Sequence, residues 1–139
     1  MIDFHYETVQ DIVHSDKLGA WISAVIKSEN CSEGEINYVF CDDKYLLKMN
    51  QHFLDHNTYT DIISFDNSMG KELHGDIFIS TERVRENATI FNVSFKEELR
   101  RVLVHGVLHL CGYKDKTKEE SDLMRSKEDE KLAMFHVEQ

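Results

Sequence analysis

Helix-start signals in the second half of the chain restrict the fold more than any other feature of the sequence. Ser94 with Glu97, and Thr117 with Glu120, form the S/T-x-x-E pattern in which each side chain bonds the backbone N–H of the other residue. Each such cap contributes on the order of 1 kcal/mol, so the starts of two helices are placed with little freedom. The second half is therefore predicted to be mainly helical.

The first half alternates short apolar runs with helical patterns. Strands are predicted at 2–7, 35–41, 61–66 and 75–80, and helices at about 16–29, 42–55 and 80–91 and from each of the two caps onward. The helix at 16–29 has one apolar stripe, and the helix at 42–55 is expected to bury Tyr45, Leu46, Met49 and Phe53. The chain has 139 residues, 41% of them apolar, with no proline and no linker, which favours one domain spanning residues 1–139. We predict an α+β fold with a small mixed four-stranded sheet and about five helices.

The stretch HGVLHLCGYKD, residues 105–115, has the spacing of a metal site. Four residues make about one helical turn, so His105 and His109 point the same way. Two imidazoles so placed can both reach one ion at about 2.0–2.1 Å, the zinc–nitrogen distance. Gly112 is expected to end the helix, and the turn can then return Asp115 as a third ligand. The spacing predicts one zinc ion held by His105, His109 and Asp115 at the end of a central helix, with one coordination position open.

Two comparisons within the sequence bear on this prediction. His52 and His56 have the same spacing, but no helix-ending glycine and carboxylate follow them, so no metal site is predicted there. Metal peptidases carry H-E-x-x-H-x-x-G-x-x-H, in which the glutamate is the general base. Gly106 stands at that glutamate's position, which counts against ordinary peptide hydrolysis.

Three ordered segments resemble one known family. HGVLHLCGYKD is similar to the H-G-x-L-H-L-x-G-Y-D-H signature of the YbeY family of bacterial rRNA maturation factors. MNQHFLDHNTYTDIISF resembles that family's segment leading to P-T-D-V-L-S-F, and HGDIFIS resembles its G-D-I strand, so the similarity covers roughly residues 35–115. The resemblance implies a zinc-using, single-strand-specific endoribonuclease that acts in 16S rRNA 3′-end maturation and ribosome quality control. Its implied partners are rRNA and proteins of the small ribosomal subunit.

The chain departs from the family pattern at four positions. Asp115 stands at the third histidine, Lys114 at an aspartate, Tyr59 at a proline, and Leu54 at an arginine associated with RNA phosphate. Carboxylate oxygen is a good zinc ligand at about 2.0–2.2 Å, so metal binding is expected to survive. The loss of the arginine affects how the chain contacts RNA.

Other cations are candidates for the role of that arginine. The formal net charge is −10, which disfavours RNA binding by overall charge. Lys48, His52 and His56 recur every four residues on the helix that ends near residue 55, and Lys114 lies beside the third ligand. We interpret these four as RNA-facing residues. The alternative is that they are ordinary surface residues and that the ribosome positions the RNA.

The sequence does not assign the general base or the nucleophile, which is either a water activated by the metal or the RNA 2′-hydroxyl. Asp61 and Asp76 begin two strands and are candidates to orient a ligand histidine, although capping of strand ends explains them equally well. Glu98 lies on the helix face of His105 but is expected to be a solvated first-turn charge. The C-terminal helix is expected to be a covering helix without chemistry.

Two other functions remain compatible with the sequence: a metal-dependent hydrolase of another bond, such as a peptidase, and a non-catalytic ribosome assembly factor with a structural zinc. No apolar stretch is long enough to span a membrane. The acidic N-terminus does not have the pattern of a signal peptide. The three scattered cysteines fit reduced thiols, so we expect a cytoplasmic protein. The sequence does not indicate the oligomeric state.

Overall fold

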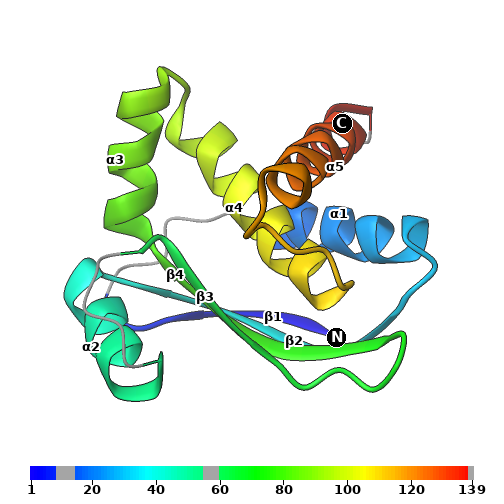
Figure 1. Cartoon of the computed structure of the whole chain (residues 1–139), viewed down its shortest axis with the longest axis horizontal. Coiled ribbons are helices and arrows are strands. Elements are labelled where there is room, and N and C mark those ends of the chain that lie inside the picture. The colour runs from blue at the N-terminus through cyan, green and yellow to red at the C-terminus, as the bar shows by residue number, and fades with distance from the viewer. Residues whose placement is uncertain (9–14, 55–59, 138–139) are drawn as a thin grey trace.

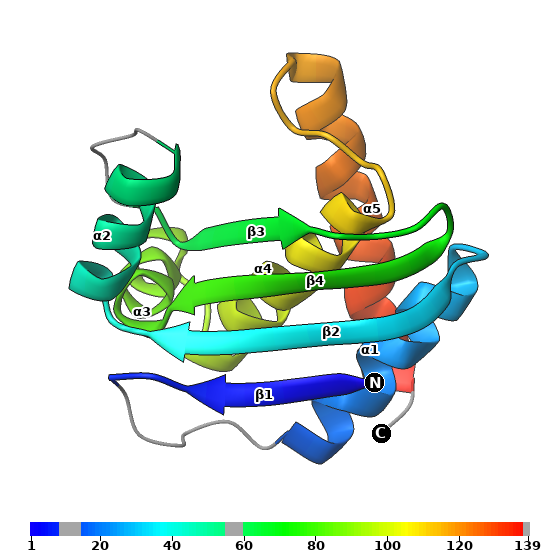
Figure 2. The same cartoon turned by 90° about the horizontal axis from the view of Figure 1, so that it is seen from below.

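The computed structural model describes residues 1–8, 15–54 and 60–137. Within them the elements are β1 (Ile2–Tyr6), α1 (Ser15–Ser28), β2 (Ser32–Cys41), α2 (Asp43–Leu54), β3 (Ile62–Asp66), β4 (Glu72–Ser80), α3 (Thr81–Phe91), α4 (Phe95–Leu110) and α5 (Lys118–Val137). The sheet has the order β1-β2-β4-β3, with β1, β2 and β4 parallel and β3 antiparallel to β4. The predicted α+β fold with a mixed four-stranded sheet and five helices is confirmed (Figures 1 and 2).

The helix boundaries follow from side-chain caps. The Ser94 hydroxyl accepts the Glu97 N–H at 3.1 Å, which is one of the two bonds that the sequence pattern predicted for the start of α4. In front of α5, Thr117 and Glu120 bond each other's backbone N–H at 3.0 and 3.1 Å. Ser80 is the cap of α3, since its hydroxyl accepts from the N–H three residues later at 3.1 Å. These bonds satisfy backbone N–H groups that have no partner within the helix.

Two strands begin earlier than predicted. β2 starts at Ser32 and β4 at Glu72, whereas the apolar pattern indicated residues 35 and 75. The early residues are mostly polar, but they pair with each other in the order Ser32 with Glu72 and Glu33 with Leu73, followed by a register shift before Ile36. Backbone pairing across the two strands therefore extends them beyond the region that apolar alternation identifies.

Helices pack on both faces of the sheet, and the hydrophobic core on one face is larger than that on the other. α1 and α4 pack on one face, where Ile77 and Ile79 of β4 join the main core (Figure 1). Phe78, between them, points to the other face and packs with Leu46 of α2 in a smaller cluster. The predicted apolar stripe of α1 is buried, and Trp21 in it donates to the Lys131 carbonyl at 2.8 Å. This bond connects α1 to α5, so the C-terminal helix is held against the core.

The burial predicted for Phe53 is wrong. Its exposed fraction is 60%, although its ring meets Phe65 edge-on at 5.9 Å. α2 lies at the end of the sheet where β2 and β4 finish, so its last turn extends past the strands (Figure 2). Leu46 is buried as expected, while Tyr45 and Met49 are half-buried. Among the described residues no helix is both long and apolar enough to cross a membrane.

Candidate metal centre

α4 places two imidazole rings side by side. The helix is the most buried in the described chain, with apolar residues from Leu99 to Leu110 packed in the main core. His105 and His109 occupy its half-exposed face, one turn apart. Their Nε2 atoms are 3.1 Å apart and the rings meet edge-on. Both nitrogens therefore point toward one location outside the helix.

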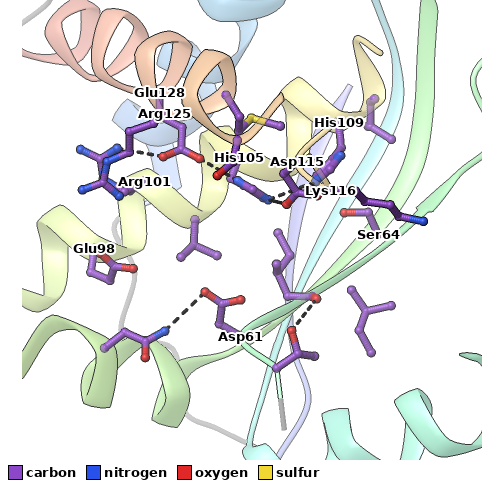
Figure 3. A pocket seen from close by; sticks show the side chains of 18 of the residues that line it. Asp61, Ser64, Glu98, Arg101, His105, His109, Asp115, Lys116, Arg125 and Glu128 are labelled. Atoms are coloured by element: carbon purple, nitrogen blue, oxygen red, sulfur yellow. Dashed lines mark hydrogen bonds and ion pairs between the residues drawn. The ribbon is translucent and has the colours of Figure 1, made fainter. Parts of the chain in front are cut away.

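The turn after α4 returns a carboxylate to the same location. Gly112 has a φ of 109°, a backbone conformation that side chains other than glycine's rarely adopt, and its N–H donates to the His109 carbonyl at 3.0 Å. The chain reverses there, and Asp115 Oδ2 comes within 3.2 Å of His105 Nε2 and 3.4 Å of His109 Nε2 (Figure 3). His105, His109 and Asp115 form a group that could hold a metal ion, with ligand atoms all within 4.8 Å of one another.

A glutamate from α5 orients the first histidine. His105 Nδ1 donates to Glu128 Oε2 at 2.6 Å, and the Glu128 side chain is only 7% exposed. The other oxygen of Glu128 accepts from Arg101 at 2.8 Å, so the carboxylate is held on both sides. A proton on Nδ1 leaves the Nε2 lone pair directed toward His109 and Asp115, as a metal ligand requires.

Glu128 was not predicted from the sequence, and the expectation that the C-terminal helix has no chemistry is corrected by its contact with His105. Glu128 stands 23 residues after His105, within the acidic and basic run SKEDEK. Nothing in that run distinguishes it from its charged neighbours. Its role depends on how α5 packs across α4, which is a long-range contact.

The carboxylates around His105 change its protonation. Burial opposes a charged imidazole, but the hydrogen bond to Glu128 and the charges of Glu128, Asp115 and Asp61 outweigh it, so the pKa of His105 is raised. A proton therefore competes with a metal ion for this ring. Metal binding at such a site is expected to release a proton.

Glu98 is buried, and the expectation of a solvated first-turn charge is wrong. Only 5% of the residue is exposed. Its side chain lies seven residues before His105 on the same helix face, and that face looks into a cavity beneath α5 (Figure 3). Burial raises the pKa of Glu98, and the negative charge of Asp61 raises it further.

The two aspartates proposed to orient a ligand histidine lie in different surroundings. Asp61 lines the same cavity as His105, accepts a long hydrogen bond of 3.5 Å from Asn87, and has a pKa raised by burial. Asp76 instead accepts from Asn37 at 3.1 Å and is not among the residues that line the cavity. Within the described part of the chain, no hydrogen bond joins either aspartate to His105 or His109.

The candidate metal centre opens into a large pocket. Its volume is about 1010 Å³, and α2, β3, α3, α4, α5 and the turn after α4 contribute to its walls. Figure 3 shows Arg101 and Arg125 on one side of His105 and Lys116 on the other, with Asp61 across the cavity. Glu98 lies on α4, the helix that carries His105. Small-molecule sites usually have about 300–1,000 Å³, so the volume of this pocket lies at the upper end of that range.

The four residues interpreted as RNA-facing lie outside this pocket or outside the described residues. Lys48 and His52 are exposed on α2, Lys114 is exposed in the turn before α5, and none of them lines the pocket. His56 falls in the segment 55–59, outside the described residues, and the interpretation of all four stays a prediction. Leu54, at the place of the family's arginine, does line the pocket.

Comparison with known proteins identifies the family. The family model described as Endoribonuclease YbeY matches residues 3–136. Among curated proteins, Endoribonuclease YbeY of Flavobacterium johnsoniae is 62% identical over 139 residues, covering 100% of both chains. Endoribonuclease YbeY of Flavobacterium psychrophilum is 63% identical, covering 100% of this chain and 99% of the relative. The solution structure of TM1509 from Thermotoga maritima superposes with a TM-score of 0.72 at 26% identity, covering 99% of this chain and 91% of the other. The chain belongs to the endoribonuclease YbeY family.

Proposed function

We propose that this chain is a zinc-dependent, single-strand-specific endoribonuclease that acts in 16S rRNA 3′-end maturation and ribosome quality control. The observation that carries the proposal is the convergence of His105, His109 and Asp115 in the wall of a large pocket. Membership of a family described as endoribonucleases supplies the reaction class.

The donor set fits zinc. Two imidazole nitrogens and one carboxylate oxygen form the kind of three-ligand set that catalytic zinc sites use, with a further position left for water or substrate. We propose one ion per chain. When bound there, zinc would polarise a phosphoryl oxygen and lower the pKa of a coordinated water.

The side chains around the ion divide the remaining work. Glu128 holds His105 in the tautomer that leaves Nε2 free. Asp61 and Glu98 both face the cavity and have raised pKa values, caused first by burial. A carboxylate with a raised pKa is a stronger base than an ordinary one, so either can accept a proton from an attacking hydroxyl or return one to the leaving oxygen.

A peptidase-like activity has less support. The general base of metal peptidases would occupy position 106, but Gly106 is buried against the sheet. A Cβ added there would lie 3.0 Å from Ile62 Cδ1 and 3.0 Å from Ile77 Cγ2. A glutamate at this position would therefore point into the core, not toward the metal ligands.

The proposal that the chain is only an assembly factor rests on charge. A net charge of −10 and Leu54 in place of the arginine favour docking on the ribosome through proteins. Three ligands, however, leave an open position, whereas structural zinc sites are closed by four. We therefore propose an active enzyme whose partners are rRNA and small-subunit proteins. We place it in the cytoplasm, where the three free cysteines stay reduced.

Ribonuclease assays with zinc-loaded and chelated protein test the proposed function. The zinc-loaded protein is expected to cut single-stranded RNA, including a 16S precursor 3′ end, and to leave duplex RNA and casein intact. His109→Ala removes a ligand and controls for contaminating nucleases, while His5→Ala, at an exposed histidine bonded to Asn37, is the matched control. Cleavage that persists equally in the chelated protein and in His109→Ala would exclude the metal centre as the site of reaction.

A further inference from the structure

A second, smaller groove continues the pocket away from the metal ligands. It has a volume of about 140 Å³ and shares Phe91, Glu98, Arg101 and Arg125 with the pocket. Arg100 is added to its wall, beyond the pocket. We call this region the arginine groove, defined by Arg100, Arg101 and Arg125, and it lies between α5, the first turns of α4 and the end of α3.

Two of the three guanidinium groups are available to an outside anion. Arg101 is occupied, because it bonds Glu128 at 2.8 Å and Asp129 at 2.7 Å. Arg125 is exposed, and Arg100 lies 4.5 Å above the Phe135 ring. Among the described residues, neither Arg100 nor Arg125 has a carboxylate within ion-pair distance. A guanidinium group in this state keeps its donors for a phosphate, which it can bind through two parallel hydrogen bonds.

An exposed aromatic ring lies in the same groove. Phe91, at the end of α3, is 54% exposed and lines both the pocket and the groove. Exposed rings next to arginine side chains are the usual platform for single-stranded nucleic acids, because every base has a face that stacks. Glu97 and Glu98 also line the groove, so it is not a general anion site but a mixed surface of three guanidinium groups, two carboxyl groups and one exposed ring.

We propose that the arginine groove binds single-stranded RNA next to the nucleotides at the metal centre, with Arg100 and Arg125 on phosphates and Phe91 stacked on a base. The proposal deepens the proposed function, on which it rests, by giving the RNA a path across the enzyme. The continuity of groove and pocket favours RNA over an acidic peptide, since the strand that is cut must leave the pocket on at least one side. Lys116 lies on the other side of the metal ligands (Figure 3).

In this proposal the arginine groove takes the place of the missing arginine. The residues interpreted from the sequence as RNA-facing do not have that role. Leu54 places an apolar side chain in the pocket wall formed by α2. The available guanidinium groups come instead from α4 and α5, across the cavity. Lys48, His52 and Lys114 line neither the pocket nor the groove.

The test compares two double variants that each remove two positive charges. Arg100→Gln/Arg125→Gln alters the groove. Arg85→Gln/Lys44→Gln is the matched control, because Arg85 lies 4.5 Å above the Phe95 ring, as Arg100 does above Phe135, and neither control residue lines the pocket or the groove. Zinc-loaded protein is titrated into a fluorescein-labelled 12-nucleotide 2′-O-methyl RNA at several salt concentrations, and fluorescence anisotropy reports binding. The intactness of the RNA is checked afterwards.

The groove variant is expected to bind the RNA roughly tenfold more weakly at low salt. The slope of log K against log salt is expected to become shallower by about 1.4, because each of the two lost phosphate contacts contributes about 0.7 on a single strand. The control is expected to change affinity by less than about twofold. Phe91→Ala is expected to weaken binding with an unchanged salt slope, because stacking releases no counterions. Equal affinities and salt slopes for the two double variants would overturn the proposal. A groove variant that no longer binds small-subunit proteins but binds RNA as wild type does would also overturn it.

Two further measurements keep the result interpretable. Circular dichroism and zinc content are expected to match wild type, and the single variant Arg125→Gln, at an exposed side chain, gives the same test with half the slope change if the double variant folds poorly. His109→Ala separates this proposal from the proposed function. If groove variants bind RNA like wild type while cleavage still requires zinc and His109, only the groove assignment fails. If His109→Ala cuts RNA normally, the metal centre fails as the active site, and the anisotropy result still decides whether the groove binds RNA.

Discussion

The chain carries two histidine pairs with a spacing of four, one on α4 and one that begins on α2, and among the described residues the pair on α4 belongs to a candidate metal centre. His105 and His109 have a carboxylate within 3.4 Å and a cavity in front of them. On α2, His52 is exposed, and its ring meets the ring of its neighbour Phe53 edge-on. His56 lies beyond the described end of that helix. The sequence spacing is thus the same in both pairs, and the features that follow each pair differ.

The difference shows what a histidine pair needs beyond its spacing. α4 is followed by Gly112, which turns the chain so that Asp115 faces the pair, and it is crossed by α5, which brings Glu128 to His105. α2 lies at the end of the sheet with its last turn exposed. Besides its spacing, the candidate pair on α4 thus has one short-range feature, the turn, and one long-range feature, the crossing helix.

The largest expected effect separates the two pairs directly. His105→Ala/His109→Ala removes two of three proposed ligands and is expected to abolish zinc binding, while His52→Ala/His56→Ala is expected to retain about one zinc per chain. Metal content after purification, measured by mass spectrometry, checks this. Equal zinc content in the two double variants would end the distinction between the pairs.

The next effect concerns the turn after α4. A zinc ion held between α4 and the segment before α5 is expected to stabilise the fold by mass action, by about 4 kcal/mol at a free zinc concentration a thousandfold above Kd. Chelation is then expected to lower the melting temperature by about ten degrees. Asp115→Ala should remove this sensitivity and Asp115→His should keep it. A melting temperature of wild type that is identical with and without chelator contradicts the prediction.

The crossing helix gives a smaller effect on the same site. Glu128→Gln keeps the size of the side chain but removes the charge that orients His105, so zinc affinity is expected to fall about 10- to 100-fold. Asp129→Asn is the matched control, because Asp129 bonds Arg101 but not His105. Competition with a chromophoric chelator measures both affinities. If both variants lose affinity equally, the effect belongs to Arg101 and not to the histidine.

The buried carboxyl group of Glu98 predicts that the stability of the fold depends on pH. The pKa of Glu98 is raised from 4.5 by burial, so the folded protein favours the neutral carboxyl, and this contribution is present below pH 4.5 and lost as pH rises through the folded value. Glu98→Gln, which cannot ionise, is therefore expected to stabilise the chelated protein at pH 8 and to have little effect at pH 4. Glu97→Gln, at the exposed neighbouring side chain, is the matched control. Denaturant unfolding at both pH values measures the free energies, and a Gln variant that is less stable at pH 8 would reverse the assignment.

The smallest effect is expected on the exposed face of α2. Lys48→Ala/His52→Ala/Lys114→Ala removes the described residues interpreted from the sequence as RNA-facing, all of which lie outside the pocket. We expect RNA affinity to change by less than about twofold between pH 6 and 8, because exposed charges outside a binding cavity are screened by salt. Anisotropy titrations at several pH values check this. A large loss of affinity at pH 6 that fades by pH 8 would instead support the interpretation of these residues as RNA-facing.

Short-range features were predictable because their causes lie within one or two turns of chain. The caps at Ser94 and Thr117, the turn at Gly112 and the ligand spacing from His105 to Asp115 each depend on backbone geometry over at most eleven residues, counted from HGVLHLCGYKD. The alternation in β3 and β4 likewise follows from the period of a strand. These local rules were sufficient for the fold class and for the grouping of the candidate metal ligands.

The tertiary structure alone decided the features that depend on packing between distant segments. Glu128 contacts His105 across 23 residues. Glu98 is buried in the first turn of α4, where it shares a cavity wall with residues of β3, α3 and α5. Phe53 is exposed because α2 ends beyond the sheet. Arg100 and Arg125 meet in one groove because α4 and α5 pack together. Side chains of one charge look alike in a sequence, and only the packing of the helices determines which of them lie in a cavity beside the metal ligands and which lie in water.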